Sequence, residues 1–140
     1  MLYLDTSLLV SALTREADSD VAQGWLARQD AYDLAISHWV VVEFSAALSS
    51  KVRNKQLSRD EKAASLAVFR DLMKSSMTLL PVSLADFEAA VRIADDHASR
   101  LRSGDALHLA IASNHDATLC TRDRQFAEGG TAIGLAITLI

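Results

Sequence analysis

The sequence predicts an α/β protein, a three-layer α/β/α sandwich around a mostly parallel sheet of about five strands. Short apolar runs alternate along the chain with long segments of helical periodicity, which is typical of parallel sheets covered by helices on both faces. The chain has 140 residues, of which 50% are hydrophobic. This size and apolar content indicate one domain, which we expect to span residues 1–140.

The candidate strands are short and apolar, as expected for strands inside a sheet. The first, LYLD, is a candidate for the centre of the sheet and ends in Asp5. The fourth, ATLCT, contains the only cysteine, Cys120, so no internal disulfide can form and a small buried thiol is expected. The predicted strands are residues 2–5, 33–37, 78–82, 117–121 and 134–140.

The segments between these strands have helical patterns. The segment that begins at His38 carries apolar residues at the spacing of one helix face, namely Val40, Phe44, Ala47, Leu48 and Val52. Ser58 followed by Glu61, and Ser83 followed by Asp86, are typical of helix starts, because such pairs can bond the free backbone N–H groups. Other helices are predicted at 7–13, 19–28 and 105–114.

The C-terminal half contains two segments without a clear period. Residues 97–104 are polar and basic, and they precede the helix 105–114, which is apolar on nearly all sides and is therefore expected to be buried. After the fourth strand we expect a glycine-containing loop that leads directly to the last strand.

The composition disfavours several classes of protein. The net charge of −4 argues against a nucleic-acid binder that relies on bulk positive charge, although local basic clusters are present. No apolar run reaches the length of about 18 residues that a membrane span requires. No basic segment followed by an apolar run and a cleavage site marks a signal peptide. We therefore expect a soluble, cytoplasmic protein without membrane contacts.

A carboxylate follows two of the predicted strands. Asp5 ends the first strand, and Asp123 lies two residues beyond the fourth, in CTRD. In a parallel sheet both positions lie at the same edge, where open α/β sheets bind ligands. Asp5, like Thr6 and Ser7 after it, can instead cap the following helix. Both interpretations stay open at this point.

Two further acids border apolar helices. Glu43 lies about 60° around its helix from Val40, at the edge of the apolar face, where an unpaired charge is costly. Asp105 opens the nearly all-apolar helix, where the ordinary explanation is a favourable interaction with the helix N-terminus. Each acid has an ordinary explanation singly, but together they favour convergence on one pocket.

Converging carboxylates need a compensating charge. Two carboxylates about 4 Å apart repel by roughly 4 kcal/mol at an effective dielectric of about 20, against a typical domain stability of about 5–15 kcal/mol. Either some acids are protonated or a divalent cation lies among them, and oxygen ligands suit Mg²⁺ or Mn²⁺. Such a site can polarise a phosphoryl oxygen and lower the pKa of a bound water, which is the chemistry of phosphodiester hydrolysis. Thr6 and Ser7 would then cap the helix or orient Asp5, and Thr121 would support the site.

Four segments resemble the PIN-domain ribonucleases, and among them the VapC toxins of bacterial type II toxin–antitoxin pairs. The segments are YLDTSLLV near the start, VVEFSAAL around Glu43, LRSGDALHLAIA at 101–112 and LCTRDRQF at 119–126. They have the order and spacing of that family and cover nearly the whole chain. The resemblance implies a PIN-like α/β/α sandwich and assigns both metal binding and catalysis to four acids, Asp5, Glu43, Asp105 and Asp123.

The resemblance also implies the activity and the partners. It indicates a Mg²⁺- or Mn²⁺-dependent endoribonuclease that cleaves RNA, forms homodimers and is neutralised by a VapB-like antitoxin. Candidate substrate-binding residues are Thr6, Ser7, Thr121 and Arg122. Further candidates for contacts with the RNA backbone are Arg100, Arg102 and Arg124.

Three alternatives are less favoured. A PIN-fold binding module with an inactive site is disfavoured by the four intact acids. A receiver-type phosphoacceptor domain is also a small parallel α/β fold with clustered acids, but it needs a second acid near the first strand and a lysine after the last, and no lysine follows Lys74. A zinc site is disfavoured because the histidines lack short paired spacings, and His108 is expected to be structural.

Overall fold

The computed structural model describes residues 1–140 and contains one sheet of five parallel strands in the order β3-β2-β1-β4-β5. The expected sheet is confirmed, and it is parallel throughout. Each predicted strand is present, and all five are shorter than predicted, because the sheet pairs only part of each apolar run. The strands are β1 (Leu2–Leu4), β2 (Leu34–Ser37), β3 (Thr78–Leu80), β4 (Thr118–Thr121) and β5 (Ile137–Leu139).

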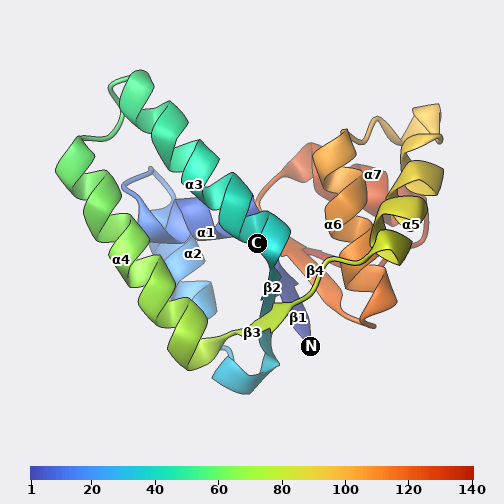
Figure 1. The fold of residues 1–140 in the computed structure, drawn as a ribbon, viewed down its shortest axis with the longest axis horizontal. Coiled ribbons are helices and arrows are strands. Elements are labelled where there is room, and N and C mark those ends of the chain that lie inside the picture. The colour runs from blue at the N-terminus through green and yellow to red at the C-terminus, as the bar shows by residue number, and fades with distance from the viewer.

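The helices form two groups with the sheet between them (Figure 1). The first group follows β1 and β2 and consists of α1 (Thr6–Leu13), α2 (Ser19–Leu26), α3 (His38–Arg53) and α4 (Arg59–Ser76). The second group consists of α5 (Leu84–Ala94), α6 (Ser103–Asn114) and α7 (Arg124–Ala132). Short 3₁₀ turns occur at Ala31–Asp33 and His97–Ser99. This arrangement is the expected three-layer α/β/α sandwich.

The strand order also decides between two of the predicted folds. Receiver-type domains place their third strand beside the first. Here β1 lies between β2 and β4, and β3 is an edge strand. The receiver-type alternative is therefore wrong.

The hydrophobic core is one connected cluster that joins both helix layers to the sheet. Helix α6 lies at its centre, and every residue from Ala106 to Ala112 is buried, as its all-round apolar sequence predicted. Cys120 in β4 is fully buried, and burial raises the pKa of its thiol to about 11. The thiol is therefore protonated at neutral pH, as expected for a small core residue.

The predicted capping pairs are present at the starts of α4 and α5. The backbone N–H of Ser58 donates to Glu61 at 2.8 Å, and the N–H of Glu61 donates to the Ser58 hydroxyl at 3.1 Å. Ser83 and Asp86 exchange the same two bonds at 2.7 and 3.3 Å. These bonds satisfy backbone groups that the first helical turn leaves free, which is why the helices begin there.

The loop predicted after β4 is wrong, because residues Arg124–Ala132 form helix α7. Gly129 and Gly130, which made this segment look like a loop, are required by packing. A Cβ at Gly129 would lie 2.5 Å from the backbone oxygen of Ser99, and a Cβ at Gly130 would collide with the Ile137 side chain. The helix accepts the propensity cost of glycine, about 1 kcal/mol each, to pack closely against its neighbours.

Helix α7 ends with a Schellman motif. Gly134 has φ of +82°, a conformation that favours glycine, and its N–H donates to the Thr131 oxygen at 3.0 Å. The N–H of Leu135 donates to the Gly130 oxygen at 3.1 Å. None of the helices has both the length and the apolar character needed to cross a membrane.

Asp86 joins α5 to α6 and provides a test of this packing. It is buried, and its carboxylate accepts bonds from Ser83 and from the Asn114 side-chain amide, each at 2.7 Å. Burial alone would raise the pKa of Asp86, but these hydrogen bonds outweigh burial and lower the pKa below its usual value. The unfolded-state pKa is about 3.9. The stabilisation is therefore complete above about pH 4 and is lost as pH falls through the lower folded-state value.

We predict that Asp86→Ala lowers the free energy of unfolding at pH 7 by about 1–3 kcal/mol, because it leaves Ser83 and Asn114 without their partner. Urea titrations from pH 7 to pH 3 measure this loss, which should shrink below about pH 4. Asp71→Ala, on the exposed face of α4, is the control and should show neither effect. A loss for Asp86→Ala that is independent of pH would contradict the assignment.

Candidate metal centre

The two central strands bring the first pair of predicted acids to one edge of the sheet. Leu4 pairs with Cys120 across β1 and β4, and the N–H of Asp5 donates to the Cys120 oxygen at 3.0 Å. Asp123 follows β4 by two residues. After β1 the chain continues to β2 on one side, and after β4 it continues to β5 on the other side. Open α/β sheets form their ligand-binding crevice between two neighbouring strands from which the chain departs in opposite directions.

Asp5 is buried, with 5% of its surface exposed, and one of its oxygens is fully engaged. Its Oδ2 accepts from the backbone N–H of Ser7 at 3.3 Å and so caps α1. The same oxygen accepts from the Ser7 hydroxyl at 2.5 Å and from the Thr121 hydroxyl at 2.7 Å. Its Oδ1 accepts no hydrogen bond within the protein and lies 3.6 Å from Nε2 of His108.

Glu43 reaches the same place from α3. Its Oε2 accepts from the Thr6 hydroxyl at 2.7 Å and lies 2.6 Å from Nε2 of His108. No group donates to its Oε1 with hydrogen-bond geometry, although the indole N–H of Trp39 lies near this carboxylate. Burial favours the neutral acid, but the hydrogen bonds from His108 and Thr6 outweigh it and lower the pKa of Glu43. Glu43 is therefore a carboxylate at neutral pH.

The free oxygen of Glu43 has space because residue 104 is a glycine. A Cβ on Gly104 would lie 3.0 Å from Glu43 Oε1, closer than such contacts normally allow. This role of Gly104 could not be predicted, because nothing in the sequence shows that this glycine faces Glu43.

Asp105 and Asp123 each engage one oxygen at the start of a helix. Asp105 Oδ2 accepts from the N–H of Arg102 at 2.9 Å, and Asp123 Oδ1 accepts from the N–H of Phe126 at 3.0 Å and caps α7. Burial raises the pKa of Asp105, and the negative charges of Asp123 and Asp5 raise it further. These acids are therefore close enough to repel one another.

The four acids share one pattern. Each carboxylate uses one oxygen for hydrogen bonds within the protein, and the other oxygen accepts none. Ligand atoms of Asp5, Glu43 and His108 all lie within 4.8 Å of one another, whereas Asp105 and Asp123 lie outside this closest group. Carboxylates that are held in place by one oxygen can offer the other oxygen to a hard divalent cation, and a cation among them would also relieve their mutual repulsion.

His108, which we expected to be a structural histidine, lies beside two of the acids. Only 2% of it is exposed, and its Nε2 contacts Glu43 and approaches Asp5. It lies three residues after Asp105, so both are on one face of α6. That spacing was the available signal in the sequence, although most buried histidines on apolar helices are structural.

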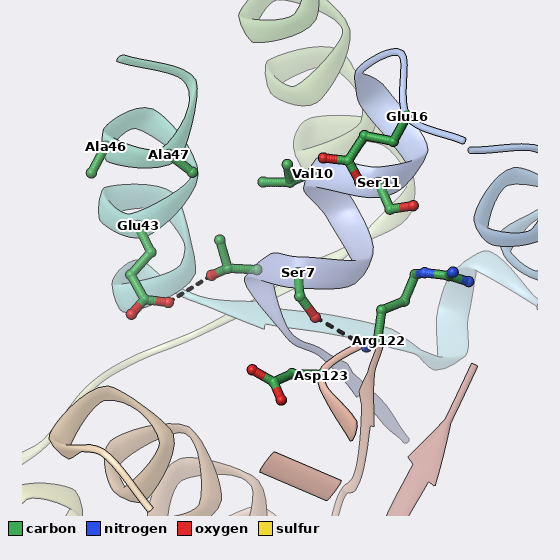
Figure 2. A pocket seen from close by; sticks show the side chains of 10 residues that line it. Ser7, Val10, Ser11, Glu16, Glu43, Ala46, Ala47, Arg122 and Asp123 are labelled. Atoms are coloured by element: carbon green, nitrogen blue, oxygen red, sulfur yellow. Dashed lines mark hydrogen bonds between the residues drawn. The ribbon is translucent and has the colours of Figure 1, made fainter. Parts of the chain in front are cut away.

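An open pocket of about 690 Å³ adjoins the acids between α1 and α3. Figure 2 shows Glu43 on one side of this pocket and Arg122 on the other, with Ser7 and Asp123 between them. The Arg122 guanidinium donates to Asp18 at 3.1 Å and also contacts the Ile140 oxygen. Of the predicted substrate-binding residues, the pocket is lined by three, Thr6, Ser7 and Arg122.

Thr121, the fourth of these residues, is fully buried beneath the pocket. Its hydroxyl donates to Asp5 and accepts from the N–H of Asp123 at 3.0 Å. Thr121 therefore holds two of the acids in place and has no exposed surface with which to contact a substrate. The arginines Arg100, Arg102 and Arg124 are exposed.

Comparison with known protein families gives a match to the PIN domain over residues 2–130. The chain belongs to the PIN domain family. Comparison with curated proteins gave no match. The family assignment agrees with the fold predicted from the four sequence segments.

Solved structures with the same fold as this PIN domain are similar over nearly their whole length. FitAcB from Neisseria gonorrhoeae is 20% identical, with a TM-score of 0.72, and the match covers 98% of this chain and 96% of the other. VapC20 from Mycobacterium tuberculosis, described as a Sarcin-Ricin loop cleaving toxin, is 18% identical, with a TM-score of 0.73 and 96% coverage of both chains. VapBC2 from Rickettsia felis, bound to a promoter DNA fragment, is 20% identical, with a TM-score of 0.68 and coverage of 99% and 98%.

We predict that Thr121→Val in this PIN domain lowers the free energy of unfolding by about 1–3 kcal/mol, because the buried carboxylate of Asp5 and the backbone N–H of Asp123 lose their partner. Urea denaturation measures the change. Thr118→Val in the same strand is the matched control, since the Thr118 hydroxyl makes no hydrogen bond within the protein. It should change stability by less than about 0.5 kcal/mol. Equal effects of the two substitutions would contradict the role assigned to Thr121.

Proposed function

We propose that this PIN domain is a divalent-metal-dependent endoribonuclease, the toxin of a type II toxin–antitoxin pair, acting in the cytoplasm. The observation that carries the proposal is the set of four carboxylates, each with one oxygen held by the protein and one left free. VapC20, which has the same fold, is described as cleaving the Sarcin-Ricin loop, and this description supports RNA as the substrate.

Asp5, Glu43, Asp105 and Asp123 would hold Mg²⁺ or Mn²⁺ and serve as the catalytic acids. A bound divalent cation supplies Lewis-acid chemistry, which stabilises charge on a phosphodiester and makes water a better nucleophile. The protein's own residues keep the acids in position. Ser7 and Thr121 hold Asp5, and Thr6 holds Glu43. Burial, together with the negative charges of Asp123 and Asp5, disfavours ionised Asp105 and raises its pKa, and the same negative charges attract a cation to the site.

The overall charge of −4 leaves RNA binding to local cations. Arg122 lies at the pocket and pairs with the exposed Asp18, a surface ion pair of small energy that a phosphate can replace. The arginines at 100, 102 and 124 are also exposed. We propose that these side chains contact the RNA backbone, whereas Thr6 and Ser7 border the reacting phosphate.

We propose a VapB-like antitoxin as the natural partner. Several structures with the same fold are toxin–antitoxin complexes, including one from Klebsiella pneumoniae. The pocket beside Glu43 has an apolar wall formed by Val10, Ala46 and Ala47. An antitoxin segment that covered this wall would also block access to the acids.

A binding module with the same fold but without catalysis is the second candidate. The intact set of acids favours the enzyme, since a binding module has no need to hold four repelling carboxylates near one another. Metal binding therefore separates the two candidates before any RNA is added.

We predict that the purified chain, freed from any antitoxin, binds Mn²⁺ in calorimetry and cleaves RNA in the presence of Mg²⁺ or Mn²⁺. Asp5→Asn should abolish cleavage and weaken Mn²⁺ binding at least tenfold, because it removes a buried ligand charge. Asp71→Asn on the surface of α4 is the matched control and should leave both unchanged. Equal cleavage by wild type and Asp5→Asn would overturn the proposal, and absence of Mn²⁺ binding would favour the binding module.

We also propose a homodimer, supported by the outer face of α5. Leu84, Phe87 and Val91 are 75%, 52% and 60% exposed and lie along one face of this helix. They adjoin an apolar pocket of about 290 Å³ that includes Trp39 and Leu107. An exposed apolar surface of this kind is typical of interfaces between subunits.

We predict that the wild-type chain sediments as a dimer at tens of micromolar and that Val91→Glu sediments as a monomer, because a charge would be buried in the interface. Val68→Glu on α4 is the matched control, since Val68 is 49% exposed, and this variant should stay dimeric. A monomeric wild type, or a dimeric Val91→Glu, would contradict this interface.

A further inference from the structure

A continuous set of buried hydrogen bonds lies beneath the candidate metal centre. The Ser37 hydroxyl lies 2.7 Å from the Tyr3 hydroxyl, which lies 2.9 Å from Nδ1 of His108. Nε2 of His108 lies 2.6 Å from Oε2 of Glu43. Ser37, Tyr3 and His108 are almost completely buried, so these bonds are shielded from water.

The set begins and ends on one helix. Ser37 caps the N-terminus of α3, where its hydroxyl accepts from the N–H of Val40, and Glu43 lies further along α3. Between them the bonds pass through Tyr3 of β1 and His108 of α6. The arrangement therefore fixes the side chain of Glu43 against both the central strand and the buried helix.

The direction of each bond follows from Glu43. A carboxylate only accepts hydrogen bonds, so Nε2 of His108 must donate to it. In a neutral imidazole Nδ1 then accepts, and Tyr3 donates to it. Burial raises the pKa of Tyr3, so its hydroxyl keeps this proton and accepts in turn from Ser37. Every buried polar group in the set has a partner.

A purely structural role does not explain these residues. Position 108 lies between Leu107 and Leu109 on a helix that is apolar nearly all round, where another leucine would pack without polar groups to satisfy. The Glu43 side chain is 28% exposed, so without its partners it would sample several rotamers. A leucine at position 108 could not order that side chain, because it has no group that donates a hydrogen bond to Glu43.

We propose that His108 and Tyr3 are positioning residues that hold Glu43 beside Asp5, with its second oxygen free, so that a divalent cation meets ligands already in place. This inference rests on the proposed metal-dependent function. It assigns His108 to the orientation of a ligand through a hydrogen bond. Residues in such positions typically contribute about 10–100-fold in metal affinity.

Mn²⁺ titration calorimetry on the full chain tests the proposal. Tyr3→Phe removes one hydroxyl, and His108→Leu removes both nitrogens, so each should weaken Mn²⁺ binding about 10–100-fold. His108→Gln should recover most of the loss, because its amide can donate to Glu43. Thr14→Val is the matched control: its buried hydroxyl donates to the Val10 oxygen at the far end of α1, and its removal should leave Mn²⁺ affinity unchanged.

Electron paramagnetic resonance of bound Mn²⁺ adds a spectroscopic signature. The Mn²⁺ line shape should change in Tyr3→Phe and stay the same in Thr14→Val. Protein labelled with ¹⁵N-histidine should show no manganese–nitrogen coupling, because His108 orients a ligand and is not one itself. A resolved coupling would overturn the proposal in favour of direct ligation by His108.

The outcomes distinguish a failure of the proposed metal-dependent function from a failure of the positioning role of His108 and Tyr3. A wild type that binds no Mn²⁺ would refute the proposed function, and this inference with it. A wild type that binds Mn²⁺, with unchanged affinity in Tyr3→Phe and His108→Leu, would overturn only this inference, as would equal losses for leucine and glutamine at position 108. If His108→Leu fails to fold, Tyr3→Phe, which removes a single oxygen atom, decides the question.

Discussion

The pairing of β1 with β4 is the constraint on which the candidate site depends. It places Asp5 beside Thr121 at the carboxyl edge of the sheet, although the two residues are far apart in the sequence. The same pairing makes this edge the point from which the chain departs in two directions, and α3 and α6 then bring Glu43 and His108 to it. Without this pairing the acids would belong to separate surfaces.

Helix capping and metal chemistry are compatible roles for the same carboxylate. Asp5 caps α1 and Asp123 caps α7 with one oxygen each, and Asp105 accepts a backbone N–H at the start of α6. A cap contributes about 1 kcal/mol, whereas two carboxylates about 4 Å apart repel by roughly 4 kcal/mol. Capping therefore offsets only part of such a repulsion, and protonation of one acid or a bound cation would relieve the remainder.

Tertiary packing overrode the local pattern in two places. Two glycines made the segment after β4 look like a loop, yet they are the residues that let α7 approach Ser99 and Ile137. Gly104 likewise leaves room for the free oxygen of Glu43. A glycine selected for close approach cannot be distinguished in a sequence from one selected for a turn, because the neighbour that requires it comes from a distant segment.

The sequence by itself determined the fold class, the strands, most of the helix starts and the four acids. These features are readable because burial periodicity and capping depend on residues a few positions apart. Only the tertiary structure decided which oxygen of each acid stays free, that Thr121 lies under Asp5, and that Tyr3 and His108 connect to Glu43. The bonds between Thr121 and Asp5, Thr6 and Glu43, Tyr3 and His108, and His108 and Glu43 join residues separated by 37 to 116 positions. They depend on strand order and helix packing, which local sequence patterns do not reveal.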